Sequence, residues 1–131
     1  MSKQRQNYAS ASPWEDLVGY SRAVKIGPFI QVAGTTATDA QGQPVGTGDA
    51  YEQTRYILQK IARALHHFST DLSAVTRTRM YAVDIDQWED IGRAHGEFFG
   101  TIRPAATLIE VSRLIGPELL VEIEVDAYVG D

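Results

Sequence analysis

The sequence predicts an α+β fold in which one sheet carries two helices on one face. Three observations support this prediction: helical periodicity over about residues 50–68 and 88–100, strict strand alternation over 119–129, and turn signals at even intervals between them. The expected order of elements is ββαβαββ. A chain of 131 residues, with 44% hydrophobic residues, is long enough for one core and too short for two.

The first predicted elements are two strands, over residues 20–26 and 29–35. Both segments are rich in β-branched and aromatic residues, and Gly27-Pro28 separates them. We therefore expect an antiparallel hairpin to open the fold.

Each predicted helix follows an Asp-x-x-Glu spacing, which is typical of a helix N-cap. Asp49 and Glu52 precede an apolar stripe that continues to about residue 68. Asp86 and Glu89 have the same spacing before a second stripe that ends near Gly100. We expect one helix after each pair.

The remaining strands are predicted over residues 75–83, 105–111 and 119–129. In the last of these, apolar residues alternate with Glu122, Glu124 and Asp126, so one face meets the core and the other is polar. Carboxylates about 7 Å apart on one strand face repel each other unless cations or donors intervene. Arg77 and Arg79 of the 75–83 strand are candidate partners, and a solvated ion-pair ladder is the structural alternative to a functional site.

Composition limits the classes of function. The net charge of −5 opposes nucleic-acid binding, no segment is apolar enough for a membrane span, and cysteine is absent, which removes thiolate chemistry and Cys-based metal sites. Residues 1–12 are polar and lack the apolar run of a signal peptide, so we expect a cytoplasmic protein.

The three histidines give no metal-site pattern. His66 and His67 are adjacent on a predicted helix and diverge by about 100°, so they cannot chelate one ion together. His95 lies on the apolar stripe of the second helix, one turn after Gly92, and a half-buried histidine with a satisfied hydrogen bond is its first interpretation. A mid-helix glycine costs roughly 1 kcal/mol relative to alanine, which suggests that the sheet or a ligand approaches closely at Gly92.

Two stretches resemble the signature of the RidA/YjgF reactive-intermediate deaminase superfamily. They are Arg103-Pro-Ala-Ala-Thr-Leu-Ile-Glu-Val-Ser-Arg-Leu114 and Leu120-Val-Glu-Ile-Glu-Val125. The likeness begins at Gly19 and includes the strand segment Val32-Ala-Gly34-Thr, Asp84-Ile-Asp86 and Phe98-Phe99. It divides the chain into an N-terminal arm, residues 1–18, and a RidA/YjgF-like domain, residues 19–131.

The resemblance implies a chorismate-mutase-like single domain with a mixed sheet, assembled as a homotrimer with clefts between subunits. It also implies hydrolysis of small enamines or imines, with release of ammonia and without a metal or organic cofactor. The glutamate that acts on water corresponds to Glu122, and Tyr20 and Gly34 are retained. The arginine that holds a substrate carboxylate corresponds to Ala106, so this anchor is missing.

The other site residues implied by the resemblance lie around these positions. Thr107 adjoins Ala106, while Gly92 and His95 fall on the altered cleft wall. Arg22 and Arg103 are candidate substitutes for the missing arginine. We therefore expect a deaminase of altered substrate range; the alternatives are a trimer that binds a small metabolite without converting it and, less favoured because of the acidic charge, an endoribonuclease.

Overall fold

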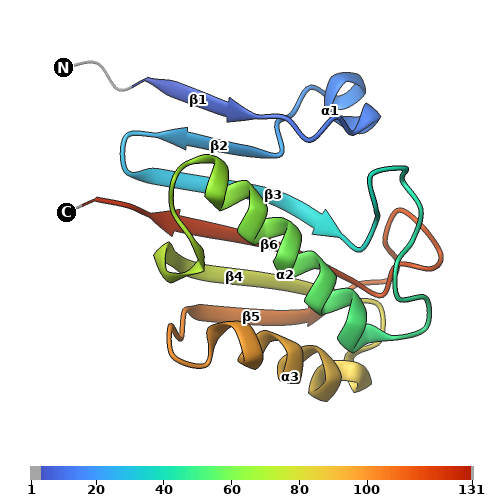
Figure 1. Cartoon of the computed structure of the whole chain (residues 1–131). Helices are drawn as coiled ribbons and strands as arrows, with labels where there is room; N and C mark the ends of the chain where they lie inside the picture. The colour runs from blue at the N-terminus through green and yellow to red at the C-terminus, as the bar shows by residue number, and fades with distance from the viewer. Residues whose placement is uncertain (1–3, 131) are drawn as a thin grey trace.

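A six-stranded mixed sheet carries two long helices on one face (Figure 1). The computed structural model describes residues 4–130, so Met1–Lys3 of the predicted arm and Asp131 of the predicted domain lie outside the described residues. The strand order is β1-β2-β3-β6-β4-β5, and only the β4–β5 pair is parallel among these strands. The main elements are β1 (Arg5–Tyr8), α1 (Pro13–Val18), β2 (Ala23–Ile26), β3 (Phe29–Thr36), α2 (Ala50–His67), β4 (Val75–Ala82), α3 (Trp88–Phe99), β5 (Ala105–Glu110) and β6 (Val121–Tyr128). The predicted α+β class and the helices on one face are confirmed.

The helix α2 begins where the sequence predicts it. The Asp49 carboxylate accepts a hydrogen bond from the Glu52 main-chain N–H at 3.0 Å, which satisfies one free donor of the first turn. The buried stripe then faces the sheet and includes Ile57, Leu58 and Ile61, all with no exposed surface. Burying such a side chain contributes roughly 1.5–3 kcal/mol, so this stripe holds α2 across the sheet.

The alternation of β6 is also confirmed. Val121, Ile123 and Val125 are buried beneath the helices, whereas Glu122 and Glu124 lie on the opposite face. The strand lies between β3 and β4, antiparallel to both. Its polar residues therefore occupy the middle of the helix-free face, which we call the open face.

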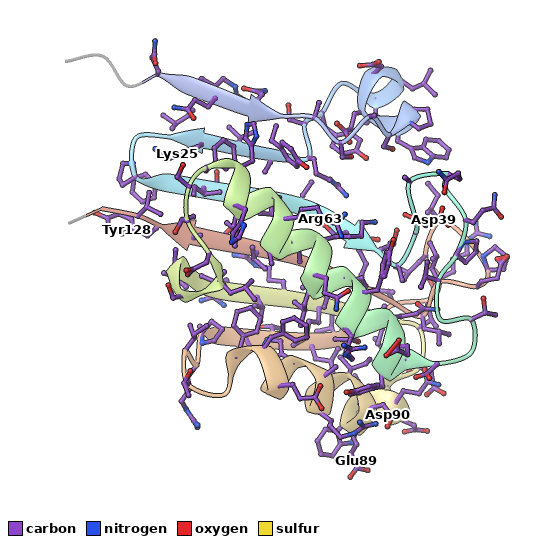
Figure 2. The ribbon with its side chains drawn as sticks, viewed as in Figure 1. Lys25, Asp39, Arg63, Glu89, Asp90 and Tyr128 are labelled. Atoms are coloured by element: carbon purple, nitrogen blue, oxygen red, sulfur yellow. The ribbon has the colours of Figure 1, made fainter. Side chains whose placement is uncertain are left out.

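The predicted cap of α3 is wrong. Gln87 is the N-cap residue and makes no side-chain cap bond, while the Asp84 carboxylate accepts from the Asp86 main-chain N–H at 3.0 Å and caps a short 3₁₀ turn, Ile85–Gln87. The turn shifts the helix start beyond Asp86. Glu89 and Asp90 instead lie in the first turn of α3 and project away from the sheet (Figure 2), where they complement the helix dipole.

The hairpin does not open the fold. The strand β1, within the predicted arm, pairs antiparallel with β2 and forms one edge of the sheet, and α1 follows it (Figure 1). The predicted strand over 20–26 begins later, at Ala23, because Tyr20 follows directly on the left-handed cap of α1 at Gly19. Within residues 4–130, no helix is long and apolar enough to cross a membrane.

Candidate functional site

Glu122 and Gly34 lie against each other on the open face. Glu122 of β6 is in register with Thr36 of β3, and β3 is irregular between Val32 and Thr35, where Gly34 lies. A Cβ atom on Gly34 would stand 2.1 Å from Glu122 Oε2, closer than any real contact. The carboxylate therefore occupies the space that a side chain at residue 34 would fill, and the structure brings these two predicted site residues together.

Arg22 and Tyr20 complete this group. The Arg22 side chain donates from Nη2 to the Gly34 carbonyl oxygen at 2.8 Å, and its guanidinium lies 5.6 Å from the centre of the Tyr20 ring. Although both residues precede β2, Arg22 is still held by main-chain bonds, from its N–H to Tyr8 O and from Ala33 N–H to its own oxygen, both 2.9 Å. Four predicted site residues, from three separate segments, thus form one cluster, which we call the Glu122 cluster: Tyr20, Arg22, Gly34 and Glu122.

The surroundings of Glu122 suit proton transfer. Burial raises the pKa of its carboxyl group, the Arg22 guanidinium lowers this pKa, and the Glu124 carboxylate raises it. The net direction is upward, because desolvation of the charged form is the largest effect. A raised pKa makes the carboxylate a stronger base, which favours acceptance of a proton from water.

The other carboxylates of β6 are paired. Arg79 Nη1 lies 3.1 Å from Asp126 Oδ2 and 3.7 Å from Glu124 Oε2, so the ion-pair ladder predicted as the structural alternative is present at these two positions. Tyr81, which sequence reasoning missed, donates its hydroxyl to Glu124 Oε1 at 2.5 Å, and this bond raises the pKa of the phenol. Tyr81 is in register with Glu122, so alternation along β4 is the signal that would have found it.

Lys60 of α2 is a second residue that sequence reasoning missed. Its Nζ donates to the Thr36 and Thr38 carbonyl oxygens at 2.7 and 2.9 Å, which ties the helix to the end of β3. Burial, followed by the positive charges of Arg22 and Arg63, lowers the pKa of Lys60 to about 8, while Asp39 opposes this shift. Figure 2 shows Arg63 on α2 and Asp39 in the loop after β3. No pattern in the helical stripe distinguishes this lysine from a solvated one.

The position of the missing arginine lies far from Glu122 within one chain. Ala106 is in register with Thr78, whose side chain is buried on the helix side, whereas Glu122 is in register with Tyr81. Ala106 is therefore displaced along the sheet, two strands away, and its register with Thr78 puts it on the helix side of β5. Figure 1 shows β5 at the edge of the sheet. Thr107 shares the open face with Arg79 but lies on the same edge.

Arg103, Gly92 and His95 are likewise outside the Glu122 cluster. Arg103 precedes β5 with a φ of 58° and bonds through its N–H to Phe99 O at 2.8 Å. His95 Nε2 and Thr78 Oγ1 are 2.9 Å apart on the helix side, and burial lowers the pKa of this histidine, as expected for a satisfied half-buried side chain. Of the two alternatives predicted for Gly92, close approach of the sheet is wrong, because nothing in the described chain lies within 4 Å of a Cβ placed there. Close approach of a ligand stays a prediction.

The Glu122 cluster borders neither of two hollows in the described chain and contains no metal-binding group. One hollow, of about 620 Å³, is lined by Val83, Leu119 and the loop over residues 112–117, and another, of about 700 Å³, is lined by residues 88–90, 92 and 93. Of the predicted site residues, only Gly92 borders either of these two hollows. In the part of the chain that the structure describes, no group of three or more His, Cys, Asp or Glu side chains is arranged to hold a metal ion. The Glu122 cluster is instead a polar group on an open sheet face.

Comparison with known proteins agrees with this architecture. The family model described as Endoribonuclease L-PSP matches residues 11–129. The crystal structure of Rv2704 from Mycobacterium tuberculosis, described as a member of the YjgF/YER057c/UK114 family, superposes with a TM-score of 0.86 at 47% identity, covering 96% of this chain and 100% of that one. The chain belongs to the RidA/YjgF superfamily.

Curated relatives of this RidA/YjgF chain extend the comparison. Protein SCO2049 of Streptomyces coelicolor is 40% identical over 121 residues, which cover 92% of this chain and 90% of that protein. A protein of Acinetobacter baylyi named 3-aminoacrylate deaminase RutC is 31% identical over 113 residues, covering 86% of this chain and 89% of that protein. The superfamily therefore includes a named deaminase among the relatives of this chain.

Proposed function

We propose that this RidA/YjgF protein is a hydrolytic enamine/imine deaminase that acts on a small metabolite in clefts between the subunits of a homotrimer. The observation that carries the proposal is the half-buried Glu122, held against Gly34 beside Arg22, with its pKa raised by burial. The Acinetobacter baylyi relative named 3-aminoacrylate deaminase supports the reaction class.

In the proposed reaction, Glu122 acts as general base and then as general acid. Its carboxylate takes a proton from water while the water oxygen bonds to the carbon of the protonated imine, and the electron pair of the C=N π bond moves to nitrogen. Glu122 then returns its proton to the nitrogen. The C–N bond breaks as the hydroxyl oxygen forms the carbonyl and releases its own proton to Glu122, which passes it to the departing ammonia, so a protonated imine and water give a carbonyl compound and an ammonium ion.

The proposal needs a second copy of the chain. The superfamily resemblance assigns Glu122 and position 106 to one cleft, yet within one chain β4 lies between the strand of Glu122, β6, and the edge strand of Ala106, β5. A head-to-tail contact that closes into a ring would bring the β5 edge of one subunit against the Glu122 cluster of the next. We expect light scattering at micromolar concentration to give the trimer mass, and a monomer mass would contradict the assembly.

Ala106 defines the expected substrate range. A hydrogen bond from a charged donor to a carboxylate contributes roughly 1.5–3 kcal/mol, and arginine also fixes the orientation of the group it binds. Without this anchor, the protein should favour imines that are recognised by groups other than a carboxylate beside the reacting carbon. Arg22 is committed to the Gly34 carbonyl, and Arg103 is exposed at the start of the β5 edge.

The deciding experiment compares wild type with Glu122→Gln, which keeps the shape of the side chain and removes its proton chemistry. Freshly generated imines with and without a carboxylate are supplied, and ammonia release is measured together with trapping of the imine. We expect turnover by wild type and a loss of at least about a hundredfold in the variant, in line with the usual contribution of a general base.

Other outcomes separate the alternatives. Binding of the imines with no ammonia from either protein would favour the metabolite-binding trimer, which the replacement by Ala106 makes the second candidate. Cleavage of RNA that Glu122→Gln abolishes would favour the endoribonuclease. RNA cleavage that persists in the variant would point to a contaminant.

A further inference from the structure

Arg22 joins parts of the Glu122 cluster that are distant in sequence. Its Nη2 donates to Gly34 O at 2.8 Å, and its guanidinium lies over the Tyr20 ring. The side chain is half-buried, and its Nε is enclosed without a hydrogen-bond acceptor in the described residues. A guanidinium buried to this extent and held at Gly34 has limited freedom to follow a ligand.

The main chain at Gly34 determines where Glu122 can lie. The Glu122 carboxylate occupies the space beside the Gly34 Cα, so a shift of that Cα either releases the carboxylate or pushes it away. Gly34 also lies at the irregularity of β3, between the paired residues Val32 and Thr35, where the regular ladder to β6 is interrupted. The bond from Arg22 to the Gly34 carbonyl therefore restrains the part of β3 that the ladder leaves least constrained.

We propose that Arg22 is a positioning residue of the Glu122 cluster: it fixes the Gly34 main chain and supplies the positive charge that faces the Glu122 carboxylate. This role is distinct from anchoring the carboxylate of a substrate. The expected effect on turnover rests on the proposed deaminase function. The expected effect on the titration of Glu122 does not, because the contacts of Arg22 exist in the protein without any substrate.

The charged groups around Glu122 predict the direction in which its pKa moves when the charge of Arg22 is removed. Arg22 lowers the pKa of Glu122, whereas Glu124, on the same strand, raises it. From β4, Tyr81 faces Glu122 as a neutral phenol bonded to Glu124, and from β3 the register partner is the uncharged Thr36. Removing the charge of Arg22 should therefore move the titration of Glu122 to higher pH.

Two substitutions separate the hydrogen bond from the charge. Arg22→Gln removes the charge, and Arg22→Lys keeps a charge but replaces the planar donor with a shorter, more strongly hydrated one. Arg77→Gln is the matched control: it makes the same charge change on the open face, at a residue in register with Asp126 rather than with Glu122. Trimer mass and urea unfolding are measured for each variant to identify those that fold.

The first measurement is the titration of the Glu122 carboxyl carbon, followed by NMR in selectively labelled protein with Glu122→Gln as the assignment control. We expect a shift to higher pH in Arg22→Gln, a titration near that of wild type in Arg22→Lys, and no change in Arg77→Gln. This readout stands even if no imine is turned over, so failure of the deaminase proposal and failure of this one are distinguishable.

The second measurement is the pH profile of turnover on an imine without a carboxylate. In Arg22→Gln, kcat should fall about tenfold to a hundredfold, as for a slightly misplaced catalytic group, with KM within about threefold of wild type. In Arg22→Gln, the limb of the profile assigned to Glu122 should move to higher pH. In Arg22→Lys, this limb should lie near its wild-type position while kcat recovers only in part, because lysine keeps the charge but not the planar donor.

Two results would overturn the proposal. An unchanged Glu122 titration in a folded Arg22→Gln trimer would show that the guanidinium does not act on this carboxylate. A rise in KM confined to imines that carry a carboxylate, with kcat unchanged, would show that Arg22 anchors the substrate instead. If Arg22→Gln does not fold, the same two criteria apply to Arg22→Met, which keeps the apolar stem.

Discussion

Substitution of Gly34 by alanine should separate activity from stability. The new Cβ would stand 2.1 Å from Glu122 Oε2, 3.1 Å from Cδ and 3.5 Å from Cγ. To reach an ordinary van der Waals separation, the carboxylate oxygen must withdraw by about 1 Å or more. Since the obstructing atom is the end of a flexible side chain, Glu122 should rotate while the sheet stays in place.

Gly34→Ala should change the free energy of unfolding only slightly but reduce the catalytic rate strongly. Displacing the Glu122 side chain from its preferred rotamer destabilises the fold by roughly 0.5–1.5 kcal/mol. Replacing glycine by alanine restricts the unfolded chain, which stabilises the fold by about 0.4–1 kcal/mol. Alanine can adopt the native main-chain conformation here because φ at Gly34 is not positive. The net change in unfolding free energy should therefore lie within about 1 kcal/mol. A catalytic group displaced by about 1 Å can lose about a hundredfold in rate.

The assay pairs ammonia release from an imine with urea unfolding at fixed protein concentration, because the stability of an oligomer depends on concentration. Gly96→Ala is the control, since nothing lies within 4 Å of a Cβ at this position of α3. It should stabilise the helix by up to about 1 kcal/mol and leave turnover unchanged. Full activity of Gly34→Ala, or a loss of several kcal/mol, would refute the packing of Glu122 on Gly34.

Two further substitutions test the charge and the substrate range of the cleft. Ala106→Arg should raise kcat/KM for 2-iminopropionate by about tenfold to a hundredfold, from roughly 1.5–3 kcal/mol of recovered carboxylate binding, and an intact trimer without a gain would favour a cleft built for another ligand. Glu122→Gln should be more stable than wild type by a margin that grows with pH. The fold raises the pKa of Glu122 above its value of 4.5, so the stability contributed by the protonated carboxyl is present below pH 4.5 and is lost as pH rises through the folded-state pKa; a margin constant with pH in urea unfolding would contradict this.

Much of the fold was predictable because it depends on local patterns. The stripe of α2, its Asp49 cap and the alternation along β6 each repeat within a few residues, and each appears in the structure nearly as predicted. The need of the β6 carboxylates for cations also followed from local chemistry, and Arg79, a predicted partner, lies beside Glu124 and Asp126. The predicted N-cap of α3 was wrong because Asp84 caps a 3₁₀ turn, Ile85–Gln87, which contains Asp86 and moves the helix start to Trp88.

By itself, the sequence determined the types of element, which strand face is polar and which side chains have the chemistry for proton transfer. Only the tertiary structure decided that β6 lies between β3 and β4, which brings Glu122 onto Gly34, and that Ala106 lies on the far edge of the sheet. It also joined β1 to the sheet and bonded Lys60 to the end of β3. The physical reason is that strand order and register follow from burial summed over the whole core, and no window of neighbouring residues contains that sum.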